Sequence, residues 1–232
     1  MFQLQYELVQ NLEKFGEVEL KIHRLKDLDQ AIDQVFAYLE AQGNPQQLEE
    51  LCPYFGVIWP AARGLTLHLN SWDKNTLSQM RILELGCGLA LPSLFAARLG
   101  AQVVATDFHP EVPRILELNM KENQISSLHY IPLNWEKNDY SSLHGQFDLI
   151  LGSDILYEQR FPQSLSHSLK HLLAPHGKIL ISDPGRPYLQ SFVDQMKSLG
   201  FSSQTHIYPV NHPPHQVEVF VLSFQPSDSS SL

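Results

Sequence analysis

Cysteine is scarce in this sequence of 232 residues, which contains only Cys52 and Cys87. Two cysteines cannot form a disulfide framework or a cysteine-rich zinc site. Long apolar runs are also missing, since none approaches the roughly 20 residues that a membrane-spanning helix needs. The first ten residues, MFQLQYELVQ, lack the basic and then apolar order of a secretory signal. These absences predict a soluble protein of the reducing cytoplasm with no membrane association.

Lysine and arginine are outnumbered by acidic residues, 16 to 25, which gives a net charge of −9. No local cluster of basic residues stands out. An acidic surface repels phosphate backbones, so nucleic-acid binding is not expected and a cationic partner suits the chain better. Histidine is plentiful, but His206, His212 and His215 show no metal-ligand spacing with a carboxylate. No metal site is predicted.

The length and a hydrophobic content of 43% fit one globular domain, or one domain with an appendage. Apolar residues alternate in two stretches of the first 24 residues, which predicts two strands joined by a turn at residues 11–16. Helical spacing follows over residues 25–39, and a short helix is expected at 46–51. Residues 1–51 are therefore assigned to an N-terminal hairpin and helix appendage. We expect this appendage to lie over the carboxyl edge of the main sheet, on the substrate side.

From Met80 onward, apolar strands alternate with helices. This order predicts an α/β fold with a Rossmann-like, doubly wound and mostly parallel seven-stranded sheet. The last two strands lack an intervening helix and should form an antiparallel pair. The domain is assigned to residues 52–225, and the polar residues 226–232 to a flexible tail. Strands are predicted at 81–85, 102–107, 129–135, 147–154, 178–183, 203–210 and 215–224, and helices at 60–70, 91–99, 113–123, 161–173 and 188–199.

A glycine turn lies between the first strand and helix of this alternation, in the segment Glu84-Leu-Gly86-Cys-Gly88. Gly86 permits a tight turn, and Gly88 lets a ligand approach the backbone closely. Asp107 follows Gly86 by 21 residues and ends the next strand, where a carboxylate can accept hydrogen bonds from ribose hydroxyls. A glycine turn in another α/β fold, with Asp107 as a helix cap, is the alternative.

The charge around this turn bears on which nucleotide it holds. A dinucleotide fold has a third glycine where this chain has Leu91, and Glu84 would repel a pyrophosphate. The carboxylate instead suits S-adenosylmethionine, which carries a sulfonium, an ammonium and a ribose but no phosphate. The sequence therefore predicts this cofactor, with Glu84, Gly86, Gly88 and Asp107 binding it.

The glycine turn and Asp107 resemble those of the class I, seven-strand S-adenosylmethionine-dependent methyltransferases. Further motifs resemble the protein lysine methyltransferase-like branch, whose signature after the fourth strand is Asp/Glu-x-x-Tyr. They are Val57-Ile-Trp59-Pro-Ala-Ala, Asn134-Trp135, Ser153-Asp154-Ile-Leu-Tyr157 and Asp183-Pro-Gly-Arg186. The chain is also similar to bacterial electron-transfer-flavoprotein β lysine methyltransferases and to nicotinamide N-methyltransferase-like proteins. The resemblance covers about residues 54–224.

The resemblance implies roles for several residues. Asp154 and Tyr157 are the predicted catalytic residues, with Asp154 orienting the amine and Tyr157 forming an aromatic wall. The alternative is that Asp154 caps the next helix and Tyr157 only packs. Trp59, Trp135 and Ser153 are assigned to the cofactor, with core packing as the alternative for both tryptophans. Arg186 either shapes the substrate entrance, pairs with Asp183 or lies on the surface.

One position departs from the family's Gly-x-Gly-x-Gly pattern, because Ala90 stands at the third glycine. Alanine adds a methyl group and disfavours a positive φ. Cofactor binding should survive if φ at Ala90 is negative, and the departure puts in doubt the close packing of the turn rather than the fold.

The resemblance implies an enzyme that transfers a methyl group to an amine, most simply a lysine side chain of a protein substrate. A small-molecule N-methyltransferase acting on an amine or pyridine nitrogen is the first alternative. A non-catalytic module that binds the cofactor or serves assembly is the second. A DNA amino-methyltransferase is disfavoured, because Asp154-Ile-Leu-Tyr157 replaces the expected Asp/Asn-Pro-Pro-aromatic motif. The oligomeric state stays open and is compatible with a monomer.

Overall fold

A seven-stranded sheet forms the centre of the molecule in the computed structural model, which describes residues 5–137 and 141–227. The strand order is β5-β4-β3-β6-β7-β9-β8. Strands β3 to β7 are parallel, and β9 runs antiparallel to both β7 and β8. The mostly parallel sheet with an antiparallel C-terminal pair is thereby confirmed. The strands are β3 (Arg81–Leu85), β4 (Gln102–Asp107), β5 (Leu128–Pro132), β6 (Phe147–Ser153), β7 (Leu173–Asp183), β8 (Phe201–His212) and β9 (His215–Pro226).

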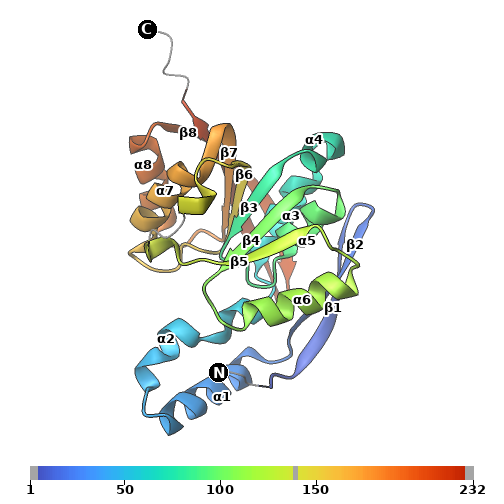
Figure 1. Cartoon of the computed structure of the whole chain (residues 1–232), viewed down its shortest axis with the longest axis vertical. Coiled ribbons are helices and arrows are strands. Elements are labelled where there is room, and N and C mark those ends of the chain that lie inside the picture. The colour runs from blue at the N-terminus through green and yellow to red at the C-terminus, as the bar shows by residue number, and fades with distance from the viewer. Residues whose placement is uncertain (1–4, 138–140, 228–232) are drawn as a thin grey trace.

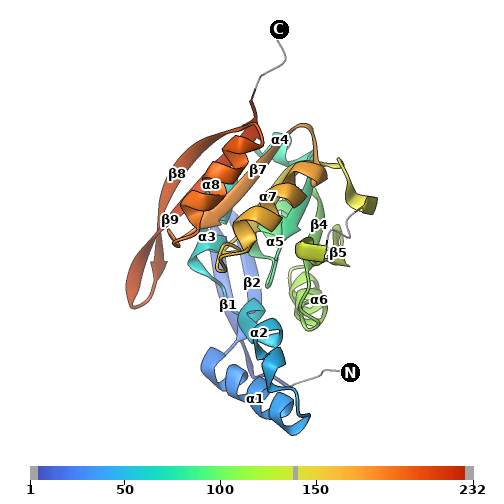
Figure 2. The same ribbon diagram turned by 90° about the vertical axis from the view of Figure 1, so that its left-hand side faces the viewer.

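Helices cover both faces of the sheet (Figures 1 and 2). Neighbouring residues in β3 point to opposite faces, so Ile82 joins one apolar core and Leu83 the other. The first core includes α3 (Pro60–Asn70), α5 (Leu91–Arg98) and α6 (Val112–Glu122). The second includes α7 (Phe161–Leu172) and α8 (Leu189–Ser198), which lie side by side in Figure 2. This two-sided burial is what a parallel sheet requires.

The N-terminal hairpin consists of β1 (Leu8–Phe15) and β2 (Val18–Leu25), joined at Gly16 and Glu17. Two strands were expected here, but the predicted turn at 11–16 was wrong because residues 11–15 belong to β1. Gly16 has a φ of 60°, which glycine adopts without steric cost, and this conformation places the turn one residue beyond Phe15. Phe2 and Leu4, which the alternation placed in a strand, lie outside the described residues.

The hairpin packs along the helix layer of the first core rather than over the carboxyl edge of the sheet, so that expectation was wrong for this part of the appendage. Leu20 and Ile22 are fully buried in the same core as α5 and α6. Asn119 of α6 and Asn123, which caps the end of this helix, each bind the backbone of β2 with both amide atoms. Glu13 of β1 forms a two-pronged ion pair with Arg63 of α3, at 2.7 and 2.8 Å. The hairpin is thus integrated into the domain.

The helices that follow the hairpin lie at one end of the molecule (Figure 2). They are α1 (Leu28–Ala41) and α2 (Leu48–Leu51), with a 3-10 turn between them at Pro45–Gln47. The side chain of Asp27 caps α1 by accepting a hydrogen bond from the Gln30 N–H. Ala31, Val35 and Leu39 are the buried residues of α1, and this helix packs on a second 3-10 turn, Pro53–Gly56. This arrangement brings the end of the appendage to the carboxyl edge.

Several element boundaries differ from the sequence-based expectation. The strand expected at 129–135 ends at Pro132, and Trp135 begins a 3-10 turn. A short helix, α4 (Lys74–Ser78), was not predicted because one turn is too short to show a period. Pro226 still belongs to β9, while residues 228–232 of the predicted tail lie outside the described residues.

Candidate active site

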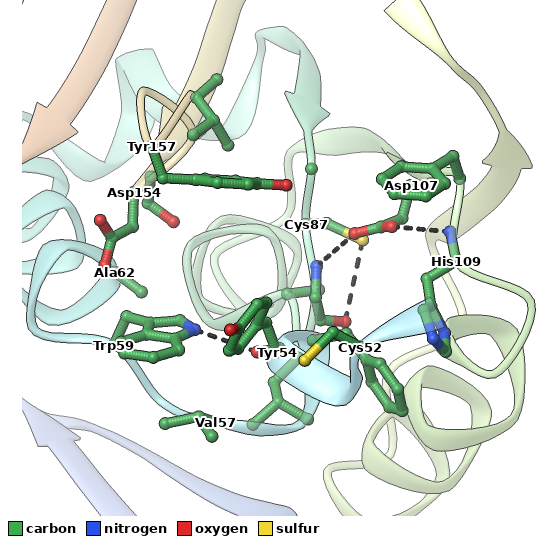
Figure 3. A pocket seen from close by; sticks show the side chains of 18 of the residues that line it. Cys52, Tyr54, Val57, Trp59, Ala62, Cys87, Asp107, His109, Asp154 and Tyr157 are labelled. Carbon is green, nitrogen blue, oxygen red and sulfur yellow. Dashed lines mark hydrogen bonds between the residues drawn. The ribbon is translucent and has the colours of Figure 1, made fainter. Parts of the chain in front are cut away.

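An open cavity lies where β3, β4 and β6 end together at the carboxyl edge (Figure 3). The parallel register sets these ends level, because Leu85 pairs with Thr106 in β4 and with Gly152 in β6. Eight of the nine residues assigned to the site line the cavity: Trp59, Gly86, Gly88, Asp107, Trp135, Ser153, Asp154 and Tyr157. The ninth, Glu84, does not line it.

The glycine turn closes around the Asp107 carboxylate. Gly86 and Gly88 have φ of 60° and 51°, conformations that favour glycine. A Cβ on Gly88 would come within 3.0 Å of the Phe55 carbonyl oxygen, so only glycine fits there without movement. Asp107 accepts one hydrogen bond from the Gly88 N–H at 3.0 Å and another from the His109 N–H at 2.9 Å. Burial raises the pKa of Asp107, and these two hydrogen bonds oppose that rise.

Ala90 has a φ of 57°, so the negative φ under which cofactor binding was expected to survive the missing glycine is not found. The residue precedes α5 and is fully buried in the first core. The left-handed conformation costs a non-glycine residue about 1–2 kcal/mol, and the surrounding packing holds it. The chain therefore keeps the backbone shape of a third glycine without having the glycine.

Glu84 lies beneath the turn instead of facing the cavity. Its side chain is fully buried, and one carboxyl oxygen accepts a hydrogen bond from the Ser93 N–H at 3.1 Å in the first turn of α5. A carboxylate at this place interacts favourably with the N-terminal end of a helix. Burial nevertheless raises the pKa of Glu84 to about 8. Its contacts tie β3 to α5 and support the glycine turn from below.

The end of the appendage supplies cavity residues that the sequence did not indicate. Glu49 and Glu50 of α2, with Cys52 and Tyr54 after it, line the cavity. They carry no motif, and only the folded chain brings them to the edge.

His109 ties this segment to the loop after β4. Its Nε2 donates to the Leu51 carbonyl at 3.2 Å, and its Nδ1 accepts from the Glu111 N–H. The ring also stacks on Phe55 at 4.3 Å. Burial lowers the pKa of His109 to about 4, so the ring is neutral at pH 7.

Aromatic side chains surround one end of the cavity. Trp59 is half-buried, and its Nε1 donates to the Tyr54 carbonyl at 3.0 Å while the two rings meet edge to face. Tyr157 packs edge to face on Phe161 and remains 39% exposed. Figure 3 shows the Tyr157 ring across the cavity from Trp59 and Tyr54, with Asp154 at the same end. Trp59 is therefore a cavity residue and not simply a core tryptophan.

Trp135 is almost fully buried, at 3% exposure, and packs against Phe161. It borders both this cavity and a second one that is lined also by Phe108, Asn134 and Glu158. Glu49 and Glu50 belong to both linings, so the two cavities are neighbours. Among the described residues, Arg160 is the only lysine or arginine in either lining, and it pairs with Glu136 and Glu158.

Asp154 is buried, with a φ of 58°. It does not cap the next helix, since α7 begins at Phe161 after Arg160. One carboxyl oxygen accepts a hydrogen bond from Arg186 Nε at 2.7 Å, and the other has no hydrogen-bond partner. Arg186 was expected to pair with Asp183, among other roles. Its side chain instead donates a hydrogen bond to Asp154, and only its backbone N–H donates to Asp183.

Neither a metal cluster nor a membrane helix is found in the part of the chain that the structure describes. No group of three histidine, cysteine, aspartate or glutamate residues there can hold a metal ion. His167 and His171 are one turn apart on α7, a metal-ligand spacing that the sequence interpretation overlooked, and His144 is near His171 at 5.8 Å between rings. No described helix is long and apolar enough to span a bilayer.

Comparison with known proteins identifies relatives of this arrangement. A family model described as lysine methyltransferase matches residues 48–198. The chain is 31% identical to the histone-arginine methyltransferase METTL23 of Xenopus laevis over 61% of its length and 64% of that protein. It is 30% identical to the electron transfer flavoprotein beta subunit lysine methyltransferase of Mus musculus, over 58% of this chain and 52% of the relative. It is 34% identical to the protein N-lysine methyltransferase METTL21A of Xenopus tropicalis, over 68% of this chain and 74% of the relative.

The match thus spans between half and two thirds of the first two relatives. Among solved structures, the precorrin-6y C5,15-methyltransferase of Geobacter metallireducens superimposes with a TM-score of 0.53 and 12% identity, over 66% of this chain and 86% of that one. This likeness shows the class I methyltransferase fold.

Proposed function

Because the chain belongs to the lysine methyltransferase family, we propose that it transfers a methyl group from S-adenosylmethionine to the side-chain nitrogen of a protein lysine. One observation carries the proposal. The cavity at the carboxyl edge is lined by four carboxylates, from Glu49, Glu50, Asp107 and Asp154, and by no lysine or arginine among the described residues. This lining repels phosphate and favours cationic ligands.

The residues present fit the proposed cofactor. Gly86 and Gly88 line the cavity at the turn, and the Asp107 carboxylate is placed to accept hydrogen bonds from ribose hydroxyls. Phe108 and Trp135 supply apolar surface for a base where the two neighbouring cavities share lining residues. S-adenosylmethionine bound there supplies a methyl group on a positively charged sulfur, as an electrophile for an amine.

The chain's own residues would orient the acceptor. A lysine amine has a reference pKa of about 10.4 and must lose its proton before its lone pair can form the new nitrogen–carbon bond. Trp59, Tyr54 and Tyr157 form an aromatic boundary that removes water from the amine, which lowers its pKa. The free carboxyl oxygen of Asp154 is placed to accept one N–H of the amine and aim its lone pair.

Cofactor binding is tested first, by calorimetry with S-adenosylmethionine on Asp107→Asn. An amide at position 107 turns an N–H toward the Gly88 or His109 N–H, or toward the ribose. We expect the affinity to fall by about tenfold or more, corresponding to roughly 1–3 kcal/mol. Asp148→Asn is the control, since Asp148 pairs with Arg81 far from the cavity. Equal affinities of the wild type and Asp107→Asn would exclude Asp107 from the binding site.

Acceptor identity is tested with radiolabelled cofactor and cell extract. Label in protein bands, found on lysine by mass spectrometry and absent with Asp154→Asn, supports the proposal. Label on arginine would contradict lysine as the acceptor and would resemble the activity in the name of the relative called a histone-arginine methyltransferase. Label only in small solutes would favour the small-molecule alternative, and cofactor binding without any transfer would favour the non-catalytic one.

A further inference from the structure

The backbone of Asp154 adopts an unfavourable conformation that its surroundings maintain. Its φ of 58° lies in the left-handed region, which aspartate visits far less readily than glycine does. The Asp154 N–H donates to the Ser182 carbonyl of the adjacent strand β7 at 2.9 Å. Such conformations persist where neighbouring contacts hold them, and they concentrate at functional sites.

The two carboxyl oxygens of Asp154 have different environments. Oδ1 accepts a hydrogen bond from Arg186 Nε at 2.7 Å, while Oδ2 is buried without a partner. The Asp154 side chain is 5% exposed and lines the cavity. An unpartnered carboxylate oxygen in such a place is costly unless a ligand donates to it.

Arg186 is itself fixed by the turn that follows β7. The Gly185 and Arg186 N–H groups both donate to Asp183 Oδ1, at 2.7 and 2.6 Å. Gly185 has a φ of 90°, which lets the chain turn back toward β6. Arg186 does not line the cavity, and its side chain is hydrogen-bonded to Asp154, which does.

We infer that Arg186 is a positioning residue for methyl transfer, because it occupies Oδ1 of Asp154 and thereby leaves Oδ2 as the oxygen that orients the acceptor amine. The inference rests on the proposed function. It gives the Asp183-Pro-Gly-Arg186 turn a role that does not require the turn to contact the cofactor.

The first test compares Arg186→Gln and Arg186→Lys with the wild type, on the protein acceptor found in extract. We expect Arg186→Gln to lower kcat by about tenfold or more, since a misplaced orienting group costs that much. The affinity for S-adenosylmethionine should stay within about twofold. Arg186→Lys should recover part of the loss, because lysine keeps the charge but not the planar geometry. Arg81→Gln is the control, as it breaks an arginine–aspartate pair at the opposite end of the strands.

A double-mutant cycle then separates positioning from a general structural role. In an Asp154→Asn background, Arg186→Gln should cause no further fall in kcat, because the group on which it acts is already altered. Equal losses from Arg186→Gln in both backgrounds would overturn the inference, and so would full activity of Arg186→Gln alone.

A crystal structure of Arg186→Gln gives a readout that does not depend on activity. We expect the Asp154 carboxylate to leave its position or its backbone to leave the left-handed region. An unchanged Asp154 would overturn the inference. If the wild type methylates no protein, the proposed function fails, and this structure still decides whether Arg186 holds the carboxylate.

Discussion

Glu84 is a carboxyl group that the fold buries completely, and its protonation is therefore linked to stability. Burial raises its pKa from 4.5 to about 8. Between these two pH values the folded state keeps a proton that the unfolded chain releases, so this group's contribution to the free energy of unfolding is fully present below about pH 4.5 and is lost as the pH rises through 8.

We expect Glu84→Gln to flatten this dependence. Its free energy of unfolding should fall less than that of the wild type between about pH 5 and 8, by on the order of 2 kcal/mol. Asp107 has a raised pKa as well, so part of the slope will remain. Urea unfolding at both pH values measures the effect, with the exposed Glu117→Gln as control. Parallel slopes for the wild type and Glu84→Gln would show that Glu84 is not protonated in the fold.

Single residues also show which parts of the site could be predicted. Gly86, Asp107 and Asp154 meet because strands in a parallel sheet end at one edge, and the order of strands along the chain already indicates this. Glu49 contributes through docking of the appendage, which leaves no local pattern, whereas His109 lies two residues after Asp107 and its place beside the site is evident from the sequence. The positive φ of Ala90 could not be predicted either, since burial of its methyl group overrides the residue's own preference.

Among the elements, helix α6 holds the N-terminal hairpin through two asparagines one turn apart. Asn119 is fully buried, accepts from the His23 N–H at 2.7 Å and donates to the His23 carbonyl at 3.2 Å. Asn123 makes the same pair of hydrogen bonds to Lys21 in a more exposed place.

Asn119→Ala should lower the free energy of unfolding by roughly 2 kcal/mol, since it leaves two backbone groups of β2 without partners. Asn123→Ala is the matched variant and should cost less than about 1 kcal/mol, because water can replace its bonds. Urea unfolding of both proteins checks the order. A larger loss from Asn123→Ala would mean that β2 depends on the exposed pair.

The elements were easier to predict than their ends. The strands from β3 to β9 were all found because each is a run of apolar residues between turn signals. The first strand was predicted to end before Asn11, whereas β1 continues to Phe15. Asn11 and Gly16 both favour turns, and only the pairing with β2 decides which of them forms the turn. The 3-10 turn at Trp135 was read as strand because its neighbour Leu133 is apolar and buried by tertiary packing.

Considered as a whole, the molecule carries a net charge of −9. If its acceptor is a lysine-bearing protein, attraction between the two will depend on ionic strength. Raising the salt concentration from about 0.05 to about 0.5 M should increase KM for the protein acceptor several-fold and change kcat little. Steady-state kinetics at saturating cofactor measures this. A KM that does not respond to salt would indicate that binding of the acceptor depends on apolar contacts.

The attachment of β2 to α6 also bears on the order in which the chain can fold. The hydrogen bonds between them join residues 96 and 102 positions apart. During translation at about 5–20 residues per second, the hairpin leaves the ribosome roughly 5–20 s before α6. Leu20 and Ile22 have no core to enter in that interval, so the nascent hairpin presents an apolar face to the cell. We therefore expect the start of this chain to bind chaperones early and to be released once α6 has been made.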